Sequence, residues 1–174
     1  TPLWLDVWGE HMHHGYYGAE GKERKDHRQA QIDLVEELLH WGKVDSAKRI
    51  LDVGCGVGGS SRLLASLFGA EVLGLTLSPV QAAHAMEETR CCKLADRVEI
   101  RAQDMMTLSE ADGQFDLVWS LESAEHIRDK KQMLEIFYER LQPGGKLLMV
   151  TWCHRNVPPD LSRGEQRTLD NICN

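Results

Sequence analysis

A glycine-dense turn at residues 52–59 separates an apolar run from a stretch with helical periodicity. The turn reads Asp-Val-Gly-Cys-Gly-Val-Gly-Gly, and the apolar run begins at Ile50 and ends at Val53. Glycine has no Cβ atom, so the backbone can turn tightly and its amides can approach a ligand, while the following helix start offers unpaired N–H donors. The pattern predicts a strand, a turn and a helix that hold the polar part of a nucleotide-like cofactor. A plain tight turn is the structural alternative.

The glycines alone do not identify the cofactor, because Gly54, Gly56 and Gly59 also satisfy the G-x-G-x-x-G pattern of dinucleotide-binding folds. Such a site expects an acidic residue at the end of the next strand, about 20 positions later. That strand ends here in Thr76-Leu77-Ser78, without a carboxylate. Asp52 instead places a carboxylate at the end of the first strand, where it would repel a pyrophosphate and attract a cationic ligand or orient amide donors. We therefore favour an adenosyl sulfonium, and an NAD-dependent oxidoreductase is the alternative.

Strand and helix patterns alternate along most of the chain. Strands are predicted at 49–53, 71–77, 97–102, 115–121 and 146–152, and helices at 31–41, 60–68, from 79, around 133–141 and from 163. This order predicts a doubly wound α/β fold, with a mostly parallel sheet covered on both faces and ligands at the carboxyl ends of its strands. We divide the chain into an N-terminal helical cover, residues 1–45, and a cofactor-binding core, residues 46–174. The last predicted strand leaves an edge that further strands would complete.

Composition narrows the range of partners. With 174 residues, of which 42% are hydrophobic, the chain has the size and apolar content of one globular domain. A net charge of −7 argues against a nucleic acid partner and favours a small-molecule substrate. We expect no transmembrane segment and no secretory signal, because no apolar run approaches the roughly 18 residues that cross a bilayer. Peripheral contact with a membrane and a homodimer are left open.

Cysteine and histidine patterns do not predict a metal site. The five cysteines form an odd set without a C-x-x-C pair, which is typical of a reducing intracellular compartment. The cluster of His11, His13 and His14 lacks a carboxylate or cysteine cluster at ligand spacing. We therefore expect no metal, and interpret these histidines as part of a cover over the site.

Four ordered motifs resemble those of class I S-adenosylmethionine-dependent methyltransferases: the glycine turn, Asp104 after the third strand, residues 115–118 and residues 141–145. More narrowly, four segments resemble the γ-tocopherol C-methyltransferase family, which includes relatives that methylate nitrogen on plant indole alkaloids. These segments are residues 8–17, 74–81, 118–123 and 150–155. Members of that family continue beyond the position of Cys173 with strands and an acceptor-covering part that this sequence lacks.

The resemblance implies an activity and a location. It implies S-adenosylmethionine as methyl donor, S-adenosylhomocysteine as product, and C-methylation of a tocopherol-type phenol or quinol. N-methylation of an indole amine is the alternative acceptor chemistry, and a non-catalytic cofactor-binding module is an alternative of another class. The implied location is a plastid, at the chloroplast envelope, or a cyanobacterial cell, and otherwise the cytoplasm.

The resemblance also assigns cofactor-binding residues. Backbone groups of the turn would meet the methionine end, polar groups after the second strand the ribose, Asp104 and Met105 the adenine, and the end of the fourth strand the sulfonium; aromatic residues would cover it by cation–π attraction. The full set is Asp52, Gly54, Cys55, Gly56, Gly58, Thr76, Leu77, Gln81, Asp104, Met105, Ser120, Leu121, Tyr16 and Tyr17. Solvated cap and turn roles are the alternatives for Thr76, Gln81 and Asp104.

The segment after the fourth strand supplies the candidate catalytic residues. Glu122, Glu125 and His126 have helical spacing, so one face of a helical turn would present two carboxylates and an imidazole to the pocket. His126 is the preferred general base, because an imidazole titrates near neutrality and can remove a proton as the methyl group arrives. A cap or core-packing role is the alternative for His126.

Overall fold

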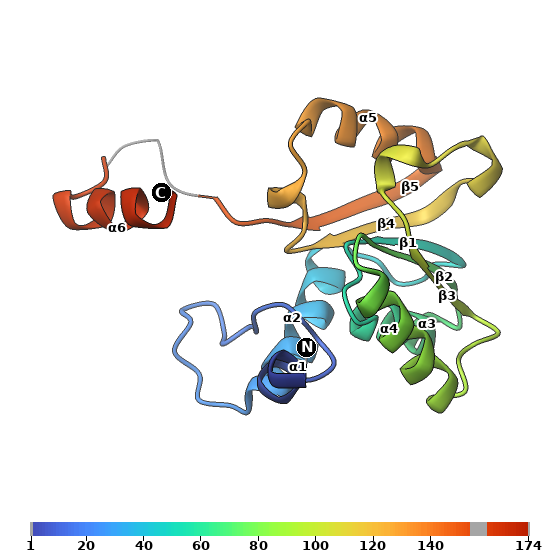
Figure 1. The fold of residues 1–174 in the computed structure, drawn as a ribbon, viewed down its shortest axis with the longest axis horizontal. Coiled ribbons are helices and arrows are strands. Elements are labelled where there is room, and N and C mark those ends of the chain that lie inside the picture. The colour runs from blue at the N-terminus through green and yellow to red at the C-terminus, as the bar shows by residue number, and fades with distance from the viewer. Residues whose placement is uncertain (1, 154–159, 174) are drawn as a thin grey trace.

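The computed structural model describes residues 2–153 and 160–173. A five-stranded parallel sheet lies at its centre, in the order β3-β2-β1-β4-β5 (Figure 1). The strands are β1 Arg49–Val53, β2 Glu71–Thr76, β3 Val98–Ala102, β4 Phe115–Leu121 and β5 Leu141–Val150. The order turns back at β1, which pairs with β2 on one side and β4 on the other. Such a switch point opens a crevice at the carboxyl ends of the strands.

Helices cover both faces of the sheet, which confirms the doubly wound α/β prediction. On one face, α2 (His27–Trp41), α3 (Gly59–Phe68) and α4 (Pro79–Cys91) pack against the apolar side chains of one core cluster. On the other face, α5 (Lys130–Arg140) packs against the second cluster through Met133 and Phe137. The buried strands therefore read as nearly continuous apolar runs.

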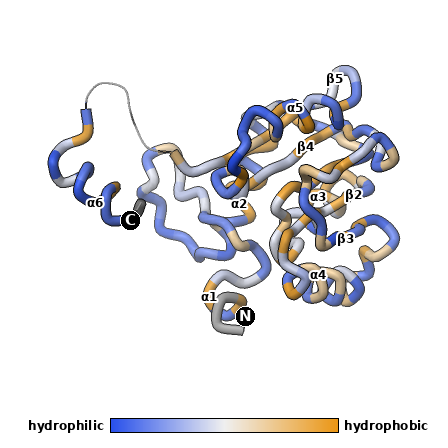
Figure 2. The backbone as a smooth tube through the Cα atoms, turned by 45° about the horizontal axis from the view of Figure 1, so that its top comes forward, coloured by the Kyte–Doolittle hydropathy of each residue, from blue (hydrophilic) through white to orange (hydrophobic). Residues whose placement is uncertain are grey.

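The two ends of the chain lie outside these layers. A short helix, α1 (Pro2–Trp8), was not predicted and lies near α2, while α6 (Arg163–Cys173) stands apart from the sheet (Figure 1). Hydrophobic stretches concentrate in the sheet and the helices packed on it, whereas α6 is mostly hydrophilic (Figure 2). No helix in the described part of the chain is long and apolar enough to span a bilayer. Cys55, Cys91, Cys92 and Cys153 carry free thiols.

Local signals account for most helix starts. Ser78 caps α4, where its hydroxyl accepts a hydrogen bond from the Gln81 amide at 3.3 Å and Pro79 occupies the first helical position. Asp26 and Asp129 cap α2 and α5 in the same way. The division into a cover of residues 1–45 and a core of residues 46–174 stays a prediction.

Several boundaries differ from the sequence prediction; among them, α2 begins at His27 rather than Gln31, and β5 ends at Val150 rather than Trp152. The helix predicted to reach Leu141 ends at Arg140, and the fifth strand already begins at Leu141 rather than at Lys146. Phe115 pairs with Leu141 and Leu117 with Lys146, so the residues in between bulge out of the ladder, where Gly144 takes a φ of 83°. The strand predicted to end at Leu77 ends at Thr76. The loop predicted through Pro158 and Pro159 lies outside the described residues.

Candidate functional site

A cavity of about 290 Å³ lies where the carboxyl ends of β1, β2, β3 and β4 converge. We call it the strand-end cavity. Each of these four strands supplies lining residues just after its last buried position, as expected for a parallel sheet. Its lining is Met12, Val53, Gly54, Gly56, Leu75, Thr76, Leu77, Gln81, Gln103, Asp104, Met105, Glu122, Ser123, His126 and Ile127.

Left-handed backbone brings the glycine turn close to the end of β4. Gly54 has a φ of 80°, and a Cβ atom at this position would overlap the side chain of Ser123. Ser123 is fixed there, because its hydroxyl donates to the Val53 carbonyl at 2.7 Å. Gly54 and Gly56 line the cavity, whereas Gly58 serves as the left-handed N-cap of α3 and does not line it.

The two buried polar groups of the turn face away from the cavity. Asp52 is 2% exposed and its carboxyl accepts a hydrogen bond from the Ser61 hydroxyl at 2.6 Å. Burial raises the pKa of Asp52 to about 7, against the lowering effect of that hydrogen bond. Burial also raises the pKa of the Cys55 thiol, which suits a packing role rather than a nucleophile. Neither residue lines the strand-end cavity.

Polar groups line the opposite wall. The Thr76 hydroxyl donates to the Gln81 side-chain oxygen at 2.8 Å, and the Gln81 amide in turn contacts the Met12 sulfur at 3.5 Å. Leu77, Asp104 and Met105 complete this wall. One oxygen of Asp104 accepts from the Met106 amide at 2.9 Å, which orients the carboxyl at the end of β3. The predicted ribose and adenine residues are therefore brought together at one cavity.

Ser120 and Leu121 lie behind the wall rather than in it. Both side chains are buried, and the Ser120 hydroxyl is hydrogen-bonded to that of Ser123 at 2.9 Å. Ser120 thus supports Ser123, which does line the cavity. The structure places neither Ser120 nor Leu121 in the lining.

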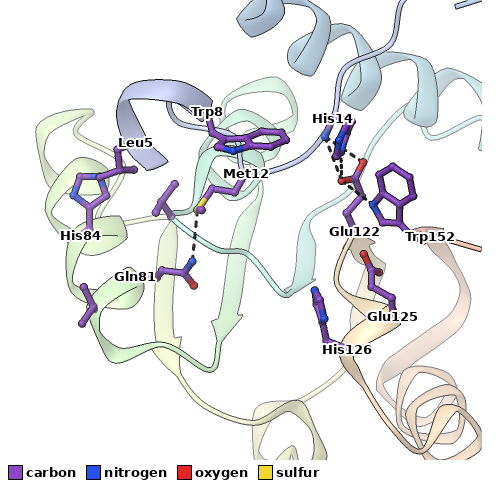
Figure 3. A pocket seen from close by; sticks show the side chains of 12 residues that line it. Leu5, Trp8, Met12, His14, Gln81, His84, Glu122, Glu125, His126 and Trp152 are labelled. Atoms are coloured by element: carbon purple, nitrogen blue, oxygen red, sulfur yellow. Dashed lines mark hydrogen bonds and ion pairs between the residues drawn. The ribbon is translucent and has the colours of Figure 1, made fainter. Parts of the chain in front are cut away.

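A larger cavity of about 770 Å³ adjoins the first beneath α1 and the loop that follows it. We call it the cover cavity, and Figure 3 shows its lining side chains. The two cavities share Met12, Gln81, Glu122 and His126. The lining of the cover cavity is Leu5, Trp8, Met12, His14, Val57, Val80, Gln81, His84, Glu122, Glu125, His126 and Trp152.

The cover cavity has two chemically different ends. Leu5 and His84 lie at one end, and Glu122, Glu125 and His126 gather at the other, with Met12 and Gln81 between them (Figure 3). Apolar surface dominates the lining as a whole, and leucine, valine, methionine and tryptophan side chains contribute it. This polarity fits an elongated ligand with a polar head and an apolar body.

Glu122 joins three segments of the chain at the polar end. It takes a left-handed backbone with a φ of 51°, an uncommon conformation for a non-glycine residue that is often found at functional sites. Its carboxylate accepts from the His14 backbone amide at 3.1 Å, contacts the His14 ring at 2.8 Å, and accepts from the Trp152 indole at 3.4 Å (Figure 3). The His14 ring packs edge-on against both Trp8 and Trp152.

The other two candidate catalytic residues lie on a short 3₁₀ helix, Ala124–His126. Glu122 lies before this helix in left-handed backbone, so the expectation of one helical face is wrong in detail. All three side chains nevertheless line the cover cavity. Glu125 accepts from the Thr151 hydroxyl at 3.0 Å, and the His126 side chain is exposed to the cavity space.

The histidines of the cover alternate in direction. His11 and His13 are buried, while Met12 and His14 line the cover cavity. The Gln31 amide donates to the backbone carbonyls of His11 and His13 at 2.5 Å and 2.8 Å, which fixes this segment to α2. No group of three or more His, Cys, Asp or Glu residues within the described ranges could hold a metal ion.

Burial keeps both inward histidines neutral. The pKa of His11 is lowered to about 4 by burial first, and then by the neighbouring charges of His13 and Arg62. Burial also lowers the pKa of His13, against the raising effect of its hydrogen bond to the His14 carbonyl. These rings therefore pack the cover onto the core in their uncharged form.

Two predicted cover residues are not brought to the cavities. The Tyr17 hydroxyl is hydrogen-bonded to the His27 ring at 3.0 Å, and the Tyr16 amide donates to the Ala30 carbonyl at 2.8 Å. Neither side chain is among the lining residues of either cavity. A direct role for Tyr16 and Tyr17 with the cofactor stays a prediction that this geometry does not support.

Sequence reasoning missed the residues that form the apolar end of the cover cavity. These are Leu5 and His84, with Val80 one helical turn before His84 on α4. Val80 and His84 have a spacing of four on α4, and this helical spacing places them on one face. Leu5 and Trp8 lie on α1, for which the sequence pattern gave no helix signal.

The arrangement fits two adjacent ligands. The strand-end cavity is lined by the backbone of the glycine turn, by the hydrogen-bonded side chains of Thr76 and Gln81, and by the Asp104 carboxylate beside the Met105 thioether. These groups suit an adenosyl ligand. The cover cavity joins it where an imidazole and two carboxylates meet. A parallel sheet with these features at its carboxyl edge is the arrangement of class I S-adenosylmethionine-dependent methyltransferases.

Comparison with known proteins places the chain within this class. The sequence profile described as mycolic acid cyclopropane synthetase matches residues 13–168, and the chain belongs to this family of S-adenosylmethionine-dependent methyltransferases. The glycine turn, β1 to β5 and all lining residues of the two cavities except Leu5, Trp8 and Met12 lie within the matched segment. The family assignment of the sequence analysis is confirmed.

Two curated relatives are similar in sequence to nearly the whole of this chain. The chain is 43% identical to the chloroplastic tocopherol O-methyltransferase of Arabidopsis thaliana over 98% of its own length and 53% of the relative. It is 30% identical to norajmaline N-methyltransferase of Rauvolfia serpentina over 98% of its length and 61% of the relative. The chain thus spans about half to three fifths of these relatives.

Solved structures show the same fold. Geranyl diphosphate C-methyltransferase from Streptomyces coelicolor A3(2) aligns with a TM-score of 0.77 over 99% of this chain and 67% of that one, at 22% identity. That crystal structure contains S-adenosyl-L-homocysteine. At this identity the likeness establishes the fold alone.

Proposed function

We propose that the protein transfers a methyl group from S-adenosylmethionine to a small, largely apolar acceptor. The observation that carries the proposal is the meeting of the two cavities at Met12, Gln81, Glu122 and His126. A methyl donor in the strand-end cavity and an acceptor in the cover cavity would face each other across these four residues. Membership in the methyltransferase family supports the same reading.

The residues of the strand-end cavity fit the donor. Close backbone at Gly54 and Gly56 would meet its methionine end, and Thr76 with Gln81 would meet the ribose hydroxyls. The free acceptor capacity of Asp104 suits the exocyclic amine of adenine, and Met105 offers an apolar surface to the ring. Asp52 would act only through Ser61 and the turn, because its carboxyl is buried.

The donor supplies an activated methyl group whose leaving thioether is neutral. The protein then has to hold the acceptor atom in line and exclude water, which is where proximity contributes most. The acceptor's lone pair or ring electrons form the new bond to the methyl carbon while the carbon–sulfur bond breaks. His126 would take the proton that the acceptor loses, a contribution of about 10²- to 10⁴-fold.

A tocopherol-type phenol or quinol is the acceptor we favour. Its polar ring would lie at the end formed by Glu122, Glu125 and His126, and its apolar tail toward Leu5. Removal of the phenol proton at His126 would enrich the ring carbon beside the hydroxyl, which permits C-methylation. The methylated carbon would then lose its hydrogen as a proton while the oxygen regains one, which restores the aromatic ring, so one proton leaves overall. The similarity to tocopherol methyltransferases supports this choice, and their chloroplastic location supports a plastid location for this protein.

An amine is the second candidate acceptor. The two carboxylates at the polar end, and the indole rings of Trp8 and Trp152 beside them, favour a protonated amine over a neutral phenol. The similarity to an alkaloid N-methyltransferase is consistent with it. The amine would lose its proton to His126 before it attacks the methyl group.

An acceptor screen with methyl-labelled S-adenosylmethionine separates these outcomes. The full-length protein is incubated with γ-tocopherol, simpler quinols and indole alkaloids, and labelled products are counted. Label on a phenol confirms the first choice and label only on amines the second. Cofactor binding by calorimetry with no labelled product from any acceptor indicates a binding module. Protection from thermal unfolding by NAD but not by S-adenosylmethionine would overturn the proposal.

A further inference from the structure

The turn that carries Glu125 and His126 is weakly held by its own backbone. It is a single 3₁₀ turn whose two internal hydrogen bonds, from the His126 amide to Ser123 and from the Ile127 amide to Ala124, measure 3.1 Å and 3.2 Å. Both lie at the long end of normal N–H···O distances. The His126 ring makes no hydrogen bond to another described residue. Some other group must therefore hold this turn in place.

Lys130 supplies that group. Its ammonium donates to the carbonyl oxygens of Ala124 at 2.6 Å, Glu125 at 3.1 Å and Ile127, so that all three of its protons are used. Within the turn, the Ala124 carbonyl accepts only the long hydrogen bond from the Ile127 amide. The carbonyls of Glu125 and Ile127 accept no hydrogen bond from the backbone of the turn. Hydrogen bonds from a charged donor are roughly twice as strong as neutral ones.

The position of Lys130 is unfavourable for the helix on which it lies. Lys130 is the first residue of α5, after the N-cap Asp129, and a cation near a helix N-terminus opposes the helix dipole. Lys131 lies beside it and reaches only Glu135 at 3.6 Å on the surface. At Lys130, the three hydrogen bonds to carbonyl oxygens outweigh the unfavourable interaction of the charge with the helix dipole. Lys131 makes no comparable contacts.

We propose that Lys130 is a positioning residue, which holds the Ala124–Ile127 turn through three carbonyl oxygens and so aims Glu125 and His126 into the cover cavity. The inference rests on the proposed function, in which His126 removes the acceptor proton. Lys130 itself does not line either cavity. It acts through the turn and not on the ligands.

The test compares Lys130→Met with Lys131→Met in the full-length protein. Methionine matches lysine in helix propensity and length but donates no hydrogen bond, so both variants lose one charge from the same helical turn. We expect Lys130→Met to lower kcat about tenfold, with KM and cofactor affinity nearly unchanged, because the base is misplaced and binding is not. Lys131→Met should leave kcat unchanged. A loss equal in both variants, or one confined to KM, would contradict the proposal.

Two further measurements distinguish a positioning role of Lys130 from a general loss of stability. In a His126→Ala background, Lys130→Met should change kcat by less than about twofold, because residues that act through one another are not additive. Hydrogen exchange at the His126 and Ile127 amides should accelerate about tenfold in Lys130→Met alone. Unchanged exchange would overturn the inference. This reading needs no turnover, so it stands even if the acceptor screen shows the proposed function to be wrong.

Discussion

The strand-end cavity and the cover cavity adjoin each other, yet they are built in different ways. The strand-end cavity is formed largely by short segments that directly follow β1, β2, β3 and β4, so the register of the sheet sets their spacing. The cover cavity draws its walls from α1, the loop after it, α4, and the ends of β4 and β5. The shape of the strand-end cavity therefore depends mainly on the sheet, whereas the shape of the cover cavity depends on how several helices, loops and strand ends pack together.

This difference separates the binding of the proposed donor from the choice of the proposed acceptor. Closely placed backbone at the sheet edge constrains one ligand tightly, because small shifts there cause overlap, as at Gly54 and Ser123. The cover cavity is held by side chains such as Glu122, which links His14 to Trp152. Changes in side chains that line only the cover cavity, such as His14 and Trp152, would alter the proposed acceptor pocket and leave the lining of the strand-end cavity unchanged.

Replacing the proposed base should have the largest effect, and it should change the rate of methyl transfer but not cofactor binding. We expect His126→Ala to lower kcat by about 10²- to 10⁴-fold while the cofactor dissociation constant stays within about threefold. His84→Ala removes the same ring from the apolar end of the cavity and serves as the matched control. Steady-state kinetics with labelled donor, together with calorimetry, measures both. Equal losses in the two variants would remove His126 from the mechanism.

A methyl group at Gly54 should damage the donor site instead. Gly54→Ala forces Ser123 away, so we expect cofactor affinity to fall on the order of 100-fold, since a shift of about 1 Å is enough for such a loss. Gly144→Ala imposes the same left-handed strain, at a φ of 83°, but nothing lies within 4 Å of the added carbon. The control should bind the cofactor normally. Calorimetry on both variants checks this, and weak binding by Gly144→Ala would implicate general instability.

Half of the predicted cofactor residues line the strand-end cavity, and most of these lie at strand ends or directly after strands. The motifs at Gly54, Thr76 and Asp104 each come after an apolar run, so strand order alone brings them together. The sequence predicted a cover over the site, but not the contacts that form the cover cavity, because contacts such as Glu122 to His14 join residues 108 positions apart. No local pattern records such a contact. The inward and outward alternation of His11 and His14 likewise depends on packing against Gln31.

Strand boundaries failed for a related reason. The sequence Pro-Gly-Gly at residues 143–145 predicts a break in secondary structure before the fifth strand. In the structure these residues form a bulge within β5 instead. Pairing of Leu141 with Phe115 on β4 overrides the local preference. Tertiary pairing of this kind cannot be read from a single segment.

Acid should affect the two regions in opposite directions. Asp52, behind the strand-end cavity, has a pKa raised to about 7 in the folded state, against 3.8 when exposed. Its contribution to stability is fully present below pH 3.8 and is lost as the pH rises through 7. His11, under the cover, has a pKa lowered to about 4 from 6.5. Its contribution is present above pH 6.5 and is lost as the pH falls toward 4.

Between pH 7 and pH 5 each of these groups should change the free energy of unfolding by about 2 kcal/mol, with opposite signs, so the wild-type protein changes little on their account. His11→Asn removes one of the two opposing histidine effects, so its stability should rise on acidification by at most about 2 kcal/mol, with His13 reducing the rise. Asp52→Asn leaves only the histidine effect, and its stability should fall by a similar amount, with His13 adding to the loss. Denaturant unfolding of the three proteins at both pH values measures these slopes. Parallel slopes in the two variants would show that neither buried group governs the response, and the contrast between the regions would then rest on geometry alone.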